Sequence, residues 1–463
     1  MAPFAPAKAQ LGVPSISVNA STVIDSEIFR DLFGTDEMRA VFSDARLVAH
    51  YLAVEVAIAK VEGALGIIPA AAAHEILAQT QRLVVDFSEL RRDTANVGYP
   101  IVGLVRQIAR ACRDGAGEYV HWGATTQDIM DTAVVLQIRE ALDLLESDLD
   151  AVADALKSLA SRHRDTPMAG RTHLQHALPI TFGYKCAVWL SGITRHQQRL
   201  RELRPRVLVG QFAGAAGTLA SLGERGPEVQ AALMHELQLG VPSCAWHVAR
   251  DNLAETVAWL GLVTGSLGKI AYDVMLLMMT ELGEVSEPYA RGRGSSSTMP
   301  QKHNPISCEV ILGCGRIVRQ NVALMLDAMV QDLERATGPW HVEWFALPQS
   351  FTLTAATLHH ARFMLEGLEV NPTRMRENLD LTGGLILAEA VMMKLGESIG
   401  RQSAYQIVYE ACRAARAGQR TLHEILAEDR TIQAQIPPDV LLSLLDPTRY
   451  VGDAPATAVR CSR

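Results

Sequence analysis

The stretch DTAVVLQIREALDLLESDLDAVADALKSLAS, residues 131–161, carries the strongest structural pattern in this 463-residue chain. Its apolar residues recur at alternating spacings of three and four, which predicts one long helix with an apolar seam. At 1.5 Å per residue this helix would be about 45 Å long. Such a length indicates a bundle shared by several subunits, although a bundle helix within one chain gives the same pattern. The seam residues are Val135, Ile138, Leu142, Leu145, Leu149, Val152, Leu156 and Leu159.

Helical patterns continue on both sides of this segment, at 44–62, 181–204, 253–282 and 309–333. Loops with glycine, proline or polar residues separate them, at 115–117, 163–172 and 210–217. Near residue 371 the pattern restarts as a smaller helical module, and the polar tail 446–463 is expected to fray. We therefore predict an all-α protein with three domains, 1–119, 120–370 and 371–463.

Composition narrows the class of protein. Nearly half of the residues, 48%, are hydrophobic and only 5% are aromatic, which is typical of a helical globular enzyme. The net charge of -8 argues against nucleic acid as a partner. Seven cysteines without a CxxC pair predict neither a disulfide framework nor a zinc site, so we expect a cytoplasmic protein. The N-terminal residues 1–17 contain prolines where a secretory signal needs an apolar run.

One segment, 257–279, is apolar and about long enough to span a bilayer. Lys269 and Asp273 lie in its middle at a spacing of four, where an ion pair on a helix is favourable. Charges at the centre of a bilayer are costly, and the chain offers no second span. We predict a helix buried in a bundle and no membrane partner.

The segment 291–305, RGRGSSSTMPQKHNP, combines flexible glycines with a run of hydroxyl residues. A loop that closes a serine over a substrate and excludes water is one interpretation, and a solvated linker is the other. Two prolines stiffen the far end, and Lys302 places a cation beside the hydroxyls. The hydroxyl residues are Ser295, Ser296, Ser297 and Thr298.

A second polar segment, VHWGATTQD at 120–128, directly precedes the long helix. Hydroxyl and amide groups at a helix N-terminus suit carboxylate binding, because the free N–H groups and the helix dipole attract anions. A capped helix start, with Thr125 or Thr126 as N-cap, is the alternative.

A third segment, MAGRTHLQHALP at 168–179, brings Arg171, His173 and His176 together before a helix. A histidine can gain or lose a proton near neutral pH, which suits it to protonating a leaving group. A single histidine is more often structural, and a metal site here would lack a third ligand.

Together the three segments resemble the signature blocks of the fumarase/aspartase, or fumarate lyase, superfamily. Residues 296–305 are similar to its GSSxMPxKxNP motif, except that Ser295 replaces the first glycine and Gly294 lies one position earlier. The resemblance covers residues 44 to about 417. It implies a central bundle of long helices and a homotetramer whose active sites are each assembled from three subunits.

The resemblance also implies the chemistry and its residues. Ser296 would remove a proton from a carbon next to a carboxylate, and His173 or His121 would protonate the leaving group. A serine is a poor base unless its alkoxide is stabilised, hence the need for Lys302 and a dry closed site. No metal or cofactor is required. The implied substrate-binding residues are Thr125, Thr126, Gln127, Arg171, Thr172, Gln211, Ser297, Met299, Lys302, Asn304, Trp340 and Trp344.

Within the superfamily, the segments 120–128, 168–185 and 334–348 most resemble bacterial 3-carboxy-cis,cis-muconate cycloisomerases. These enzymes add a carboxylate of the substrate to a conjugated double bond and form a lactone. His173 stands where they often carry tryptophan, which leaves a carbon–nitrogen lyase that releases fumarate as an alternative.

Adenylosuccinate lyase is a poorer match. Trp340 and Trp344 occupy the positions of its phosphate-binding serine and arginine, and an indole offers one donor and no charge. They indicate an apolar pocket wall, or else core tryptophans. A non-catalytic structural relative is also conceivable, but it should have lost Ser296, Lys302 or His173, and this chain has all three.

Overall fold

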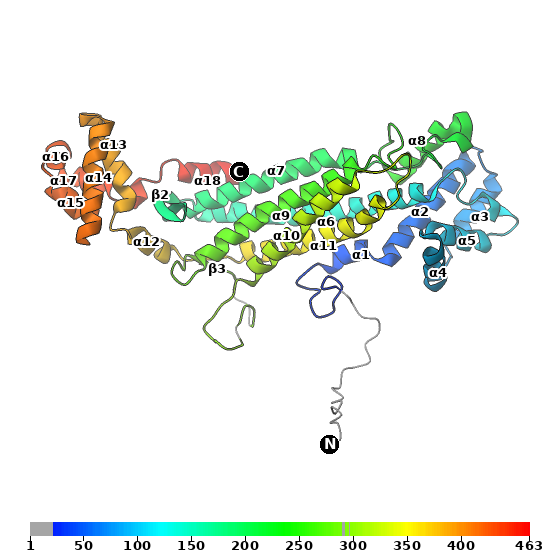
Figure 1. Ribbon diagram of the computed structural model, residues 1–463, viewed down its shortest axis with the longest axis horizontal. Helices are drawn as coiled ribbons and strands as arrows, with labels where there is room; N and C mark the ends of the chain where they lie inside the picture. The colour runs from blue at the N-terminus through cyan, green and yellow to red at the C-terminus, as the bar shows by residue number, and fades with distance from the viewer. Residues whose placement is uncertain (1–21, 289–291, 296) are drawn as a thin grey trace, which may run out of the picture.

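The computed structural model describes residues 22–288, 292–295 and 297–463 (Figure 1). The predictions for residues 1–17 and for Ser296 therefore lie outside the described residues. The described chain is mainly helical, which confirms the all-α class. Its strands form two short antiparallel pairs: β1 (Pro167–Thr172) with β2 (Gln175–Thr181), and β3 (Val285–Ser286) with β4 (Glu369–Val370).

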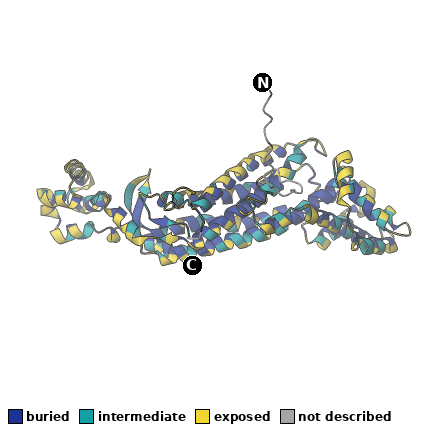
Figure 2. Cartoon of the chain, turned by 90° about the horizontal axis from the view of Figure 1, so that it is seen from below, coloured by how far each residue is buried: buried dark blue, intermediate teal, exposed yellow. Residues whose placement is uncertain are grey.

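Long helices form the centre of an elongated molecule (Figure 1). α10 packs against α9 and α11, and α6 packs against α7 and α11. Buried residues follow the bundle along its length (Figure 2). The helices are α6 (Thr126–Arg162), α7 (Phe182–Val207), α9 (Asp251–Leu277), α10 (Ile306–Ala328) and α11 (Pro339–Glu366).

Helix α6 extends the predicted helix at its N-terminus, with Thr125 as the N-cap. The eight predicted seam residues are all 0% exposed within the single chain. Each fully buried leucine contributes roughly 1.5–3 kcal/mol. Helices of the same chain already cover this seam, so the seam itself is no evidence for several subunits. The homotetramer stays a prediction.

Helix α9 is the segment that could be mistaken for a membrane span. Among the described helices it alone is long and apolar enough to cross a membrane, and 56% of its most apolar window is buried inside the protein. It packs against α7, α10 and α11, as predicted for a bundle helix. Lys269 and Asp273 form the predicted ion pair, and Asp273 also accepts a hydrogen bond from Trp189 at 3.0 Å.

Smaller helices occupy the two ends of the bundle (Figure 1). At one end are α1 (Asp36–Val41), α2 (Asp44–Ala64), α3 (Ala70–Thr80), α4 (Phe87–Val97), α5 (Ile101–Ala111), η1 (Ala116–Tyr119), η2 (Ala220–Arg225) and α8 (Gly226–Leu237). Towards the other end are α12 (Pro372–Asp380), η3 (Leu385–Leu387), α13 (Ala388–Ile399), α14 (Arg401–Gly418), α15 (Leu422–Glu428), α16 (Arg430–Gln435), α17 (Pro438–Leu444) and η4 (Pro447–Arg449). Much of this second group shares a small apolar core of its own.

The C-terminal tail returns to the bundle instead of fraying. Helix α18 (Ala454–Ser462) packs against α7 and α6, and its Ala454 and Ala458 are buried. The expectation of a frayed tail was wrong because it rested on polarity alone. Two small apolar residues four positions apart are enough to seat one face of this short helix.

The segment 163–172, predicted as a loop, ends in strand β1. Thr172 pairs with Gln175, so His173 and Leu174 form a two-residue hairpin turn. Both have positive φ, 50° and 64°, which is uncommon for residues other than glycine. The hairpin thus presents His173 at its tip in an unfavourable backbone conformation, and such strain concentrates at functional sites.

Replacing Leu149 by alanine should lower the free energy of unfolding by about 2–5 kcal/mol, because the side chain is fully buried in the α6 seam. Leu326→Ala on α10 is the matched control, since Leu326 is 54% exposed. Urea denaturation of both variants measures the difference. Equal losses of unfolding free energy in both variants would show that the buried seam stabilises the bundle no more than an exposed leucine does.

Candidate functional site

The start of α6 and the hairpin with His173 lie far apart within one chain. Thr125 precedes α6, whereas the hairpin with His173 follows the opposite end of this 37-residue helix. At 1.5 Å per residue the helix alone separates them by about 55 Å. The described residues 292–295 and 297–305 leave the bundle beside β3, before α10 (Figure 1). One chain therefore cannot bring Thr125 and His173 to the same small substrate.

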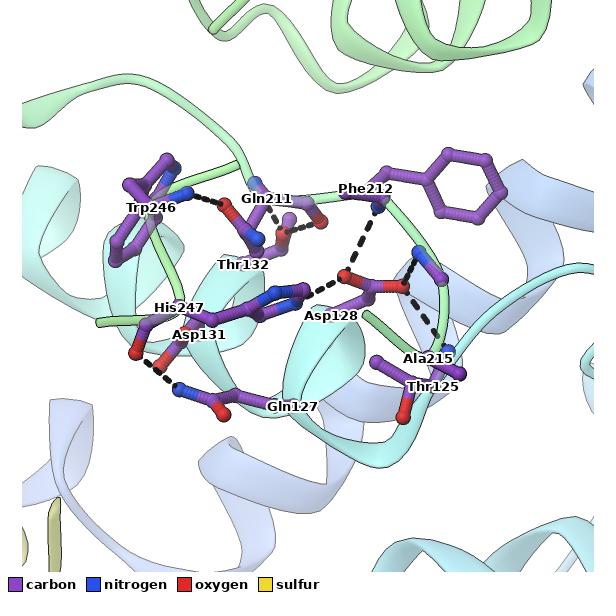
Figure 3. Close-up of polar contacts among 12 residues, drawn as sticks. Thr125, Gln127, Asp128, Asp131, Thr132, Gln211, Phe212, Ala215, Trp246 and His247 are labelled. Atoms are coloured by element: carbon purple, nitrogen blue, oxygen red, sulfur yellow. Dashed lines mark hydrogen bonds and ion pairs between the residues drawn. The ribbon is translucent and has the colours of Figure 1, made fainter. Parts of the chain in front are cut away.

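Asp128 organises the block at the start of α6 (Figure 3). Its buried carboxylate accepts hydrogen bonds from the backbone N–H groups of Thr125 at 3.0 Å, Ala213 at 3.0 Å and Gly214 at 2.9 Å. The fourth partner is the Nε2 of His247 at 2.8 Å. By accepting these hydrogen bonds, Asp128 holds the loops 210–217 and 246–250 against the N-terminus of α6.

Two predicted glutamines belong to this network (Figure 3). Gln127 donates to the carbonyl of His247 at 2.9 Å, and Gln211 accepts from the N–H of Trp246 at 3.0 Å. Each is 1% exposed, and each keeps one buried amide atom without a hydrogen-bond partner among the described residues. Buried polar atoms without partners are costly. The Oε1 of Gln127 and the Nε2 of Gln211 therefore keep unused hydrogen-bonding capacity inside this network.

Thr125 and Thr126 stand where α6 begins. The Thr125 hydroxyl accepts a hydrogen bond at 2.9 Å from Arg335, whose guanidinium also donates to the carbonyl of Ala215 at 2.9 Å. No carboxylate within the described ranges pairs with Arg335, so its positive charge is not neutralised. Together with the first N–H groups of the helix, this charge makes the start of α6 attractive to an anion.

His121 lies four residues before Thr125 and has a positive φ of 63°. Its Nδ1 is 2.7 Å from the Oε1 of Glu55 on α2, and the Glu55 side chain is 1% exposed. Burial lowers the pKa of His121, but the charge and hydrogen bond of Glu55 outweigh it, so the pKa lies above its usual value. His121 therefore keeps its proton to a higher pH than an ordinary histidine does.

Glu62 lies on the same helix, seven residues after Glu55. It is 0% exposed, and neither carboxyl oxygen has a hydrogen-bond partner in the described part of the chain. Burial, followed by the charge of Glu55, raises the pKa of Glu62 from 4.5 to about 8. Glu62 is therefore a neutral acid at pH 7.

The hairpin residues have different surroundings. Arg171 forms a bidentate ion pair with the buried Glu284, at 2.6 Å and 2.9 Å, and Asn378 donates to the same carboxylate at 2.8 Å. This pairing ties the hairpin to β3 and α12, and it engages the Arg171 guanidinium. Thr172 and His173 are exposed at the tip.

The described part of the signature loop has an anchored base and an exposed tip. Ser295 and His303 form an antiparallel bridge, and the Asn304 N–H donates to the carbonyl of Gly294 at 2.9 Å. Gly294 has a φ of 69°, and a Cβ there would lie 2.7 Å from the Asn304 oxygen. The shifted glycine is therefore a geometric requirement of this loop. Asn304 is half-buried, whereas Ser297, Met299 and Lys302 are exposed.

Trp340 and Trp344 line a cavity of about 270 Å³ between α2, α6 and α11. Their rings lie 5.2 Å apart, and Trp340 is 4% exposed. The buried Arg250 at this wall is bound by the carboxylates of Asp131 and Glu343. No donor of Arg250 is left for a substrate carboxylate, so the cavity wall suits apolar groups. Phe345, the residue after Trp344, is 76% exposed and does not line it.

Two residues that bear on the site were not singled out from the sequence. Arg335 is a single arginine in the segment 334–348, and no motif marks it. Its contact partner Thr125 lies 210 positions away in the sequence. Glu55 lies in a helix without any motif. Glutamates in such helices are usually solvated, so only the fold identifies Glu55 as the partner of His121.

Models of known protein families match two parts of the chain. A family described as lyase matches residues 33–319, and one described as adenylosuccinate lyase C-terminus matches residues 384–461. Two solved structures are close to the whole fold. The fumarate lyase from Mesorhizobium sp. BNC1 has a TM-score of 0.88 and 52% identity, covering 93% of this chain and 98% of its own. The 3-carboxy-cis,cis-muconate lactonizing enzyme from Pseudomonas putida has a TM-score of 0.89 and 44% identity, covering 94% and 98%.

Three relatives of known sequence carry different names. Trans-aconitate decarboxylase 1 of Mycosarcoma maydis is 48% identical, covering 95% of this chain and 88% of its own. A 3-carboxy-cis,cis-muconate cycloisomerase of Pseudomonas aeruginosa is 47% identical, covering 95% and 96%. The N-acetyl-S-(2-succino)cysteine lyase of Dickeya dadantii is 41% identical, covering 94% and 96%.

Replacing Glu62 by glutamine should stabilise the protein increasingly as the pH rises from about 5 to 8. The folded state holds a proton on Glu62 up to about pH 8, whereas the unfolded state releases it near the ordinary value of 4.5. Wild-type stability therefore falls through this window by up to about 1.4 kcal/mol per pH unit, and the neutral amide removes this loss. Thermal unfolding at pH 5, 6.5 and 8 measures the effect.

Glu236→Gln is the control, because Glu236 on α8 is paired with Lys60 at the surface. A stability difference between wild type and Glu62→Gln that stays constant with pH would contradict a buried neutral acid.

Proposed function

The chain belongs to the fumarate lyase (fumarase/aspartase) superfamily, and from this premise we propose that it is a 3-carboxy-cis,cis-muconate cycloisomerase. The observation that carries the proposal is the unneutralised positive end of α6, where Arg335 meets Thr125. A tricarboxylate substrate needs several such contacts. Similarity to named cycloisomerases along nearly the full length supports the same choice.

The proposed reaction is written most simply in the ring-opening direction. Ser296, stabilised by Lys302, removes a proton from the carbon next to a carboxylate, and the electron pair enters that carboxylate. The lactone C–O bond then breaks, and its oxygen leaves as a carboxylate. Lactone formation is the reverse, with the serine hydroxyl returning the proton to carbon.

A carbon–heteroatom lyase that releases fumarate is the second candidate, and His173 favours it. A carboxylate leaves readily as an anion, whereas an amine or thiol needs a proton from a general acid. His173 offers such an acid where cycloisomerases often carry tryptophan. The relative named N-acetyl-S-(2-succino)cysteine lyase supports a thiol or amine leaving group.

We propose a homotetramer in which each site combines three subunits: the α6 start of one, the hairpin of another and the signature loop of a third. The separation of Thr125 from His173 by the length of α6 supports this arrangement. The three-domain division at 119 and 370 and the cytoplasmic location stay predictions.

Purified protein should consume 3-carboxy-cis,cis-muconate, followed by its ultraviolet absorbance, and Ser296→Ala should lose at least about a thousandfold in kcat, since it lacks the base. Adenylosuccinate, argininosuccinate, N-acetyl-S-(2-succino)cysteine and trans-aconitate are tested alongside. His173→Ala should retain most of the muconate activity, because a departing carboxylate needs no acid. If the protein released fumarate from a succinylated amine or thiol and did not consume muconate, the result would contradict the cycloisomerase and support the lyase.

Mixing Ser296→Ala with His173→Ala subunits should restore part of the activity lost by both, on whichever substrate requires both residues, because some hybrid sites then receive two intact blocks. Subunit exchange is verified by native mass spectrometry of differently labelled chains. Two preparations of Ser296→Ala serve as the control. Complete exchange without any recovered activity would exclude sites shared between subunits.

A further inference from the structure

The contact between His121 and Glu55 is built into the fold. Their atoms Nδ1 and Oε1 lie 2.7 Å apart, and Glu55 approaches from α2, 66 positions earlier in the chain. His121 keeps a positive φ of 63° in this position, which is unfavourable for a histidine. A hydrogen bond to a fixed carboxylate determines which ring nitrogen faces outward.

A second buried carboxyl group, that of Glu62, lies on the same helix as Glu55. Three buried carboxyl oxygens on α2, the Oε2 of Glu55 and both oxygens of Glu62, have no hydrogen-bond partner among the described residues. Two unpaired charges in such surroundings would be expensive. Glu62 keeps its proton, because burial and the neighbouring Glu55 raise its pKa to about 8. Glu55, in contrast, has His121 as a partner at 2.7 Å.

The outward side of the imidazole is open to a ligand. No described residue forms a hydrogen bond with its Nε2, and 20% of the His121 side chain is exposed. The charged groups that act on His121 are Glu55 from α2 and Asp128 from α6. The Asp128 carboxylate is already occupied by His247 and three N–H groups. Glu55 is thus the partner that sets the state of His121.

We propose that Glu55 is a positioning residue that holds His121 as an imidazolium, whose Nε2–H donates to a substrate carboxylate at the start of α6. The inference rests on the proposed function in so far as the substrate carries carboxylates. In this proposal His121 keeps its proton and binds the carboxylate as a cation, and His173 transfers a proton to the leaving group. Arg335 and Thr125 complete the same anion site from α6 and the segment before α11.

The first test measures the protonation of His121 without turnover. Diethyl pyrocarbonate modifies the neutral imidazole, so the modification rate of His121, read by peptide mass spectrometry against pH, gives its midpoint. In Glu55→Gln the midpoint should fall by at least one pH unit. At a pH well below both midpoints the rate should then rise about tenfold, since one pKa unit is a factor of ten. Rates are normalised to the exposed His423 of each sample.

Glu62→Gln is the matched control, because it changes the same residue type on the same helix at similar burial. It replaces a neutral acid by a neutral amide, so the His121 midpoint should stay at the wild-type value. If Glu55→Gln leaves the midpoint unchanged, the proposal is wrong. A merely structural role for Glu55 would lower the melting temperature without moving that midpoint.

The second test uses tricarballylate, an unreactive tricarboxylate, and calorimetric binding to wild type and His121→Gln. Wild-type affinity should fall at least fivefold between pH 6.5 and 9, and His121→Gln should bind more weakly at pH 6.5 with a flatter pH dependence. Equal affinities in both proteins, or a wild type that does not bind, would overturn the proposal even where Glu55→Gln fails to fold. Neither test needs turnover. A protein that passes both tests but does not consume muconate would therefore contradict the proposed function and leave this proposal intact.

Discussion

The length and burial of α6 constrain everything else in this molecule. Its eight seam residues are inaccessible within the chain, so the helix is rigidly held over 37 residues. The start of this helix carries the anion-binding block, and the chain beyond its end carries the hairpin with His173. Because the helix does not bend the two together, the proposed site draws on more than one chain, and association is part of the proposed chemistry.

Buried carboxylates position the polar groups around this helix. Asp128 fastens two loops to the N-terminus of α6, Glu284 holds the hairpin through Arg171, and Glu55 orients His121. Each carboxylate is nearly inaccessible, and its partner lies far away in the sequence. Such pairs stabilise one geometry because removing either partner leaves an uncompensated buried charge. The candidate site is thus held by acids that need not touch a substrate.

The distribution of unneutralised charge separates binding surfaces from core. Arg250 is surrounded by Asp131 and Glu343, so the cavity beside it is apolar in effect despite three charged residues. Among the described residues, Arg335 forms hydrogen bonds with a hydroxyl and a carbonyl and with no carboxylate, which leaves its charge available. The two arginines look alike as sequence letters. The fold places carboxylates beside Arg250, which gives it a structural role, and it leaves the charge of Arg335 available to bind an anion.

The sequence by itself determined the helical class, the apolar seam of α6 and the three polar blocks, because helix periodicity and short motifs are local properties of the chain. It also predicted the Lys269–Asp273 pair, since that contact spans one helical turn. Only the tertiary structure decided that the α6 seam is covered within the chain, that the tail folds as α18, and that Glu55 and Arg335 join the site. These outcomes depend on contacts between distant segments, and no local pattern encodes which surface will meet which partner.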